Sequence, residues 1–122
     1  MYNIEQFPSK RRIEIRFGMF EDHDSSSTLL DIQQAVMNVK GTGEYFDMLT
    51  DYTSSMVMPQ NIADGSKDLA EWFLANGLRR SANIVQSITH RMQIARVTKR
   101  DPRFAFFGTR EEAEAWLDSG LI

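Results

Sequence analysis

The feature that most constrains the fold is an alternation of short apolar runs with longer segments whose apolar residues recur at helical spacing. Five runs have the length of strands: 2–7, 11–20, 46–52, 81–86 and 103–107. A helical segment follows each of the last four. Strands that alternate with helices are typical of a mostly parallel sheet covered by helices. We therefore expect one α/β domain over residues 1–122, with the order β-β-α-β-α-β-α-β-α.

The first two runs predict an antiparallel hairpin. Only Pro8-Ser9-Lys10 separates 2–7 from 11–20, and so short a connection favours neighbouring antiparallel strands. Apolar and charged residues alternate over 13–17, which is the pattern of a half-buried strand. The N-terminal strand should therefore lie at an edge of the sheet.

The first two helices have recognisable ends. Hydroxyl side chains are good helix caps, so the first helix should begin at Ser27 or Thr28 and the second at Ser66. Both should end where a glycine follows, at Lys40-Gly41 and Asn76-Gly77. The expected buried stripes are Leu29, Ile32, Val36 and Val39 in the first helix, and Leu69, Trp72, Phe73 and Leu74 in the second.

The third helix is predicted over 87–100. Ile88, Met92 and Ala95 share one face, which we expect to be buried because apolar stripes normally face the core. Asp101-Pro102 should close the helix, since proline disfavours helical geometry in the residue before it.

The last helix carries the clearest local signal. Thr109 and Glu112 fit a capping box, in which a hydroxyl and a carboxylate satisfy the free N–H groups of the first turn. The expected core face consists of Ala113, Trp116 and Leu117, and Gly120 should end the helix.

Composition excludes several classes of protein. The chain has no cysteine, which rules out disulfides, thiolate metal sites and a cysteine nucleophile. No apolar run approaches the ~20 residues of a membrane span, and the start lacks the order of a secretion signal, so we expect a cytoplasmic protein. Gly41-Thr42-Gly43 lacks the spacing of a nucleotide-binding loop. We therefore expect no cofactor and no metal.

Charge is unevenly distributed. The net charge is −3, yet the segment 79–103 holds seven basic residues and one acidic residue, Asp101. Such a segment can attract an acidic protein partner or an anionic ligand. His90, Arg91 and Arg96 lie in it, either on a solvated helix face or on a docking surface. The acidic balance of the chain and the lack of a stacking motif argue against nucleic acid.

A second candidate site follows the strand in FDMLTDYTSS. Asp51, Thr53, Ser54 and Ser55 stand where this strand ends. They are interpreted either as a polar loop whose side chains bond nearby backbone, or as part of the ligand crevice that open α/β sheets form beyond their strand ends.

Three stretches resemble a known family: FDMLTDYTSS, the helix around LAEWF, and the ending FAFFGTREEAEAWL. Together with the element order and size, they resemble the STAS superfamily, the small domains of anti-sigma-factor antagonists and sulphate-transporter tails. The closer likeness is to its SpoIIAA-like branch, whose fold is compared with the CRAL-TRIO lipid-binding fold. The resemblance spans most of the chain and implies a STAS-like domain.

The chain departs from this family at the phosphorylation switch. In switched antagonists the central strand leads to an Asp-Ser-Ser/Thr-Gly-Leu-type turn at a helix start, where a phosphate meets free backbone N–H groups. Here the strand leads to DYTSSMVMPQNIADGSKDL, and the first serines stand well before the helix. Ser66 is the nearest counterpart of the phospho-acceptor.

Three functions remain open on the sequence. The leading expectation is a non-catalytic regulatory or interaction module that binds a protein partner. The main alternative is a carrier or sensor of a small apolar ligand such as a lipid, in a cavity of at least ~300 Å³ lined by Met48, Met56, Met58 and Met92. The third is a small hydrolase or transferase that uses His23 or His90 with Asp51. A homodimer is compatible with all three.

Overall fold

The computed structural model describes residues 2–17, 25–41, 43, 45–53 and 60–120. Within them it contains a sheet of five strands and four α-helices, in the expected order. The strands are β1 (Tyr2–Phe7), β2 (Arg12–Phe17), β3 (Phe46–Asp51), β4 (Leu78–Ile84) and β5 (Phe104–Phe107). The helices are α1 (Ser25–Lys40), α2 (Gln60–Ala75), α3 (Ile88–Val97) and α4 (Arg110–Ser119).

The strands lie side by side in their order along the chain, from β1 to β5. β1 pairs antiparallel with β2, and all other pairs are parallel. A single 3-10 turn, Pro8–Lys10, joins the first two strands, and Arg11 closes it with a left-handed φ of 49°. The predicted hairpin and the edge position of β1 are therefore confirmed.

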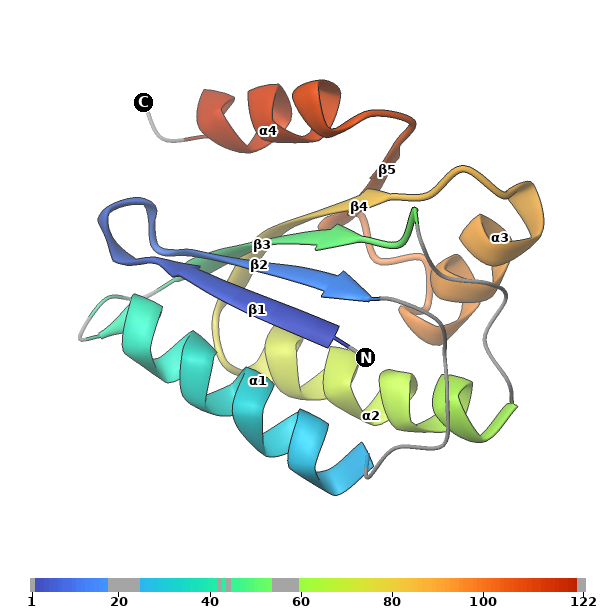
Figure 1. Ribbon diagram of the computed structural model, residues 1–122, viewed down its shortest axis with the longest axis horizontal. Helices are drawn as coiled ribbons and strands as arrows, with labels where there is room; N and C mark the ends of the chain where they lie inside the picture. The colour runs from blue at the N-terminus through green and yellow to red at the C-terminus, as the bar shows by residue number, and fades with distance from the viewer. Residues whose placement is uncertain (1, 18–24, 42, 44, 54–59, 121–122) are drawn as a thin grey trace.

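The two faces of the sheet are covered unequally. α1, α2 and α3 lie on one face, and α4 is the one helix of the described residues that covers the other (Figure 1). Parallel neighbours must be joined by crossovers, which are almost always right-handed. Crossovers of one hand between sequential neighbours all pass over the same face, so only the helix after the last strand is left for the opposite face.

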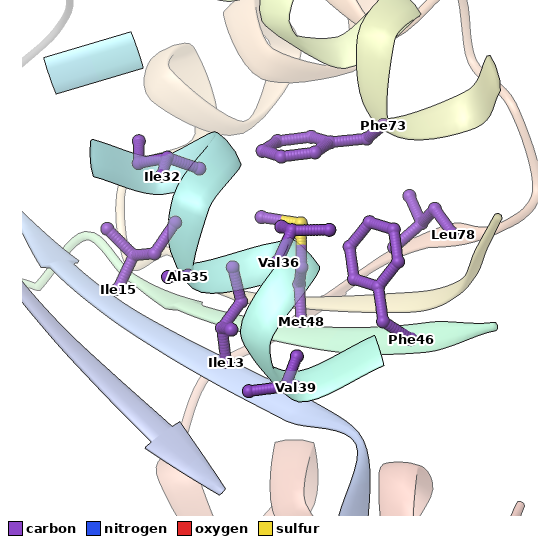
Figure 2. Close-up of a cluster of buried hydrophobic side chains, with 10 residues drawn as sticks. All are labelled: Ile13, Ile15, Ile32, Ala35, Val36, Val39, Phe46, Met48, Phe73 and Leu78. Carbon is purple, nitrogen blue, oxygen red and sulfur yellow. The ribbon is translucent and has the colours of Figure 1, made fainter. Parts of the chain in front are cut away.

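The main core lies between the sheet and the first two helices. Side chains from β2, β3, α1, α2 and the start of β4 point into one cluster (Figure 2). Its members are Ile13, Ile15, Ile32, Ala35, Val36, Val39, Phe46, Met48, Phe73 and Leu78. The apolar stripes predicted for α1 and α2 supply its helical members except Ala35, which was not predicted.

A smaller core holds α4 against the opposite face. Leu49 from β3 and Ala82 and Ile84 from β4 pack against Ala113 and Leu117, all of them buried. Trp116 packs at the border of this cluster, with its ring centroid 5.5 Å from that of Phe107. The core face predicted for the last helix is therefore confirmed.

Three predicted helix limits are wrong. α1 begins at Ser25 and α2 at Gln60, so Ser27, Thr28 and Ser66 all lie inside helices rather than at their caps. α3 ends at Val97, because Lys99 and Arg100 take left-handed φ values of 55° and 56°. Capping and stop residues set only weak local preferences, and tertiary packing extends or shortens the helix beyond them.

The buried face of α3 was also assigned wrongly. Ile88 and Met92 are 75% and 55% exposed, whereas His90 and Ile94 are buried. Both pairs have the i, i+4 spacing of one helix face, so spacing alone does not distinguish them. Ile94 packs with Val85, and this contact with the sheet turns the other pair toward solvent.

The hydroxyl half of the predicted capping box is confirmed at the start of α4, whereas the Glu112 carboxylate bonds the Thr109 hydroxyl instead of a backbone N–H group. The Thr109 Oγ1 accepts a hydrogen bond from the Glu112 backbone N–H at 3.3 Å, and the hydroxyl donates to the Glu112 carboxylate at 3.0 Å. The helix ends at Ser119, immediately before Gly120.

Replacement of Thr109 by Ala should lower the free energy of unfolding by about 1 kcal/mol, because one N–H group of the first turn loses its acceptor. Replacement by Ser keeps the hydroxyl and should change it much less. Urea denaturation of both variants is the measurement. Equal stability of the Ala and Ser variants would contradict the role of this cap.

Candidate functional site

Two arginines of the basic segment serve α4 rather than an external partner. Arg79 donates to the Gly120 carbonyl oxygen, and Arg80 donates to the Trp116 carbonyl oxygen at 2.6 Å. Both carbonyls lie at the helix end, where free C=O groups concentrate negative charge. The Arg80 guanidinium also lies 4.8 Å from the centre of the Trp116 ring. The two cations therefore cap the C-terminus of α4.

Further ion pairs fix this helix over the sheet. The buried Arg12 of β2 donates to Asp118 at 2.8 Å, and this hydrogen bond lowers the pKa of the Asp118 carboxyl. Arg79 pairs with Asp47 of β3, a carboxylate with no exposed surface. A hydrogen bond from the Arg79 Nε to Asp47 is 3.0 Å long, and it raises the pKa of Arg79.

The strand-end site is partly described. Asp51 Oδ1 accepts hydrogen bonds from the backbone N–H and the hydroxyl of Thr53, at 2.9 and 2.6 Å. Its other oxygen lies 3.6 Å from Arg16 Nε. These bonds form a local turn, as in the polar-loop interpretation. Ser54 and Ser55 lie outside the described residues.

Ser66 lies within α2, well after the first turn at Gln60. A phosphate at a helix start is stabilised by free backbone N–H groups, but in a helix interior those groups already bond the preceding turn. The position of Ser66 therefore lacks the anion site that a switched antagonist provides.

The three basic-segment residues on α3 have different surroundings. His90 is buried, with its ring 5.0 Å from that of Tyr52, edge to face. Arg91 is half-buried and donates to the Val85 carbonyl oxygen at 3.3 Å. Arg96 is exposed. The solvated or docking face predicted for these three residues is therefore wrong for His90, because the ring packs inside.

The outer side of α3 combines exposed apolar side chains with a cation. Ile88, Met92 and Arg96 are spaced at i, i+4 and i+8, so they form one row along the helix. A shallow surface hollow lies beside this row and is lined by Thr89, Met92, Gln93 and Arg96. We call Ile88, Met92 and Arg96 the outer row of α3.

The inner side of α3 covers a small pocket. The pocket has a volume of ≈ 60 Å³ and lies between the sheet, α2 and α3. Its lining comprises Ile15, Met48, Thr50, Tyr52, Leu69, Ala70, Phe73, Ser81, Asn83, Ile94, Val97, Thr98 and Phe104. Thr50, Ser81, Asn83 and Thr98 are at least nine-tenths buried, so polar groups face an otherwise apolar space.

These pocket residues were not predicted from the sequence, although a signal was present. Strands of a parallel sheet that is covered on both faces are normally apolar throughout. In SANI, Ser81 and Asn83 alternate with Ala82 and Ile84, which indicates one polar face on a central strand.

The pocket is much smaller than a lipid carrier requires. Its ≈ 60 Å³ is about a fifth of the ~300 Å³ expected for the carrier alternative. Met48 lines it, but Met92 lies on the surface. Met56 and Met58 lie outside the described residues.

The structure separates His90 from Asp51, which the hydrolase alternative would combine. Asp51 lines a hollow of about 10 Å³ with Leu49 and Arg16, on the α4 side of the sheet. Tyr52, which packs against His90, lines the pocket on the opposite side. His23 lies outside the described residues.

The described residues contain neither a metal-binding cluster nor a membrane-spanning helix. No three histidine, aspartate or glutamate side chains among them come together in an arrangement that would hold a metal ion. None of their helices combines the length and apolar character needed to cross a membrane.

Comparison with known proteins identifies no family. No protein-family model matches the chain, and no curated protein matches it.

Replacement of Arg79 by Ala should lower the free energy of unfolding by about 3 kcal/mol, because the Asp47 carboxylate is left buried without its cation. Arg103, which pairs with Asp101 in an exposed position, is a matched control. Its replacement by Ala should cost less than about 1 kcal/mol. Urea denaturation measures both, and equal losses would contradict the role of Arg79.

Stability should decrease as the pH falls below about 6.5. Burial lowers the pKa of His90 from its ordinary value of 6.5, so the unfolded chain binds a proton that the folded protein excludes. The unfolded state therefore gains relative stability from about pH 6.5 down to the lowered folded pKa. Unfolding measured between pH 7.5 and 5.5 should show a smaller slope in His90→Gln. The same slope in both proteins would exclude His90 as the cause.

Proposed function

We propose that the chain is a non-catalytic interaction module that binds an acidic, partly apolar segment of a protein partner on the outer row of α3. The observation that carries this proposal is the 75% and 55% exposure of Ile88 and Met92 on adjacent turns. Large apolar side chains that lie together at a surface commonly mark an interaction site.

Charge supports an acidic partner. Between Arg79 and Arg100 the chain has no Asp or Glu, so α3 carries no negative charge of its own. Arg96 extends the apolar row by one turn, and no carboxylate within the described residues pairs with it. A partner with apolar residues followed by a carboxylate complements this order, and its charge would accelerate association.

The rest of the surface offers a weaker candidate. α1 exposes Leu30 and Met37, by 64% and 49%. These two residues are two turns apart, and the polar Gln34 lies between them on the same side. Singly exposed apolar residues are common and need no partner.

The proposed module would be a regulatory domain of the STAS-like type. This type is supported by the element order and by the FAFFGTREEAEAWL ending, which forms β5 and the capped α4. The proposal places the protein in the cytoplasm and requires no cofactor.

The test is affinity capture from the protein's own cells with three tagged forms. The wild type should retain a partner that the Ile88→Asp/Met92→Asp double variant retains at least tenfold less, because hot-spot contacts usually exceed 1.4 kcal/mol. Met37→Asp makes the same change on α1 and should retain the partner fully. Thermal unfolding must show that all three forms are folded.

A partner retained equally by all three forms would overturn the proposal, as would a partner lost equally with Met37→Asp. Arg96→Glu refines the result, since it should weaken an acidic partner several-fold more at low salt than at high salt. Capture of a second copy of this chain would instead favour the homodimer expected as one alternative.

A further inference from the structure

The pocket beneath α3 contains a row of polar side chains where packing would favour apolar ones. Thr50 of β3 lies directly opposite Asn83 of β4 in the register, and Ser81 lies two residues before Asn83 on the same face. All three are at least 97% buried. Polar groups in such positions cost free energy unless they are hydrogen-bonded, so this row requires an explanation.

Internal hydrogen bonds account for only part of this row. Asn83 Nδ2 donates to the Ser81 and Ala105 carbonyl oxygens, at 3.2 Å each, and lies 3.4 Å from Ser81 Oγ. These bonds use the amide donors of Asn83. Among the hydrogen bonds of the described residues, none involves Asn83 Oδ1 or the Thr50 hydroxyl. An acceptor and a hydroxyl therefore border the pocket together.

The lining specifies the charge of an occupant. Among the lining residues that the structure describes there is no Lys, Arg, Asp or Glu. A buried ion without a counter-charge is strongly disfavoured, so a ligand here must be neutral. Apart from Tyr52 and Thr98, the remaining described walls are apolar side chains of the sheet, α2 and α3, which would contact the hydrocarbon part of a ligand.

The volume specifies the size. A cavity of about 150 Å³ accommodates benzene, which has six carbon atoms. By the same scale, a pocket of ≈ 60 Å³ accommodates a molecule of about three non-hydrogen atoms. At most about 1.5 kcal/mol per such atom is available for binding, so the dissociation constant should be about 1 mM or weaker.

We propose that this pocket is a binding site for a small neutral molecule that has a hydroxyl or amide at one end and a short hydrocarbon part at the other. The polar end bonds to Asn83 Oδ1 and the Thr50 hydroxyl. The hydrocarbon part packs between Phe73 and Ile94. This site is on the inner side of α3 and is independent of the partner surface proposed for the outer row.

The test is a titration of the full chain with ethanol, followed by backbone amide chemical shifts. The site predicts saturable shifts at Thr50, Ser81, Asn83 and Thr98. Thr50→Val keeps the side-chain shape but removes the hydroxyl, and it should weaken ethanol binding at least threefold. Ala70→Val adds two carbon atoms at the pocket wall and should abolish saturation.

Shifts that rise linearly without saturation would overturn the proposal and leave water as the occupant. If Thr50→Val binds ethanol as tightly as the wild type, the proposed hydrogen bond between the ligand and the Thr50 hydroxyl would be wrong. Saturation unchanged in Ala70→Val would place ethanol elsewhere. If Ala70→Val does not fold, as judged by its thermal unfolding, the comparison of wild type with Thr50→Val still decides the outcome.

Discussion

The arrangement of this molecule depends on one geometric constraint, the sequential order of its parallel strands. Parallel neighbours require crossovers, and crossovers of a single hand between sequential strands pass over one face. α1, α2 and α3 therefore share that face, and α4 must protect the other face alone (Figure 1). In a doubly wound sheet several helices cover each face. Here burial of one face depends on the last helix, so loss of that helix would expose the face.

Several arginines hold α4 in place, in addition to its apolar contacts with the sheet. Apolar packing from Leu49, Ala82 and Ile84 supplies only a small core for this helix. Arg79 and Arg80 bond its terminal carbonyls, and Arg12 bonds Asp118. Each cation meets either a carboxylate or the negative end of the helix dipole. Part of the positive charge of the basic segment is thus paired inside the domain, whereas Arg96 of α3 and Arg100 beyond it are exposed.

The fold was predictable because its signals are local. Alternation of strands and helices, the Pro8-Ser9-Lys10 connection and the Thr109 cap each act within a few residues. The limits of α2 and the orientation of α3 were not predictable from these local signals. They depend on which of several possible tertiary contacts is the most stable. His90 and Ile94 are buried on the inner side of α3, whereas Ile88 and Met92 are exposed, although both pairs have the same spacing.

The candidate site was predicted least well, and α3 shows why. Its basic residues made α3 a candidate, but burial of His90 and exposure of Ile88 are properties of packing, not of charge. Apolar contacts form the cores beneath α1, α2 and α4, and the arginine bonds near its C-terminus add to the attachment of α4. Among the side chains that the structure describes, α3 alone both presents large apolar groups to solvent and covers a polar row on the sheet. Neither feature stabilises an isolated domain, since exposed apolar surface gains nothing from folding and buried polar groups cost free energy. Domain stability alone therefore does not account for the exposed apolar pair on α3 or for the polar row beneath it.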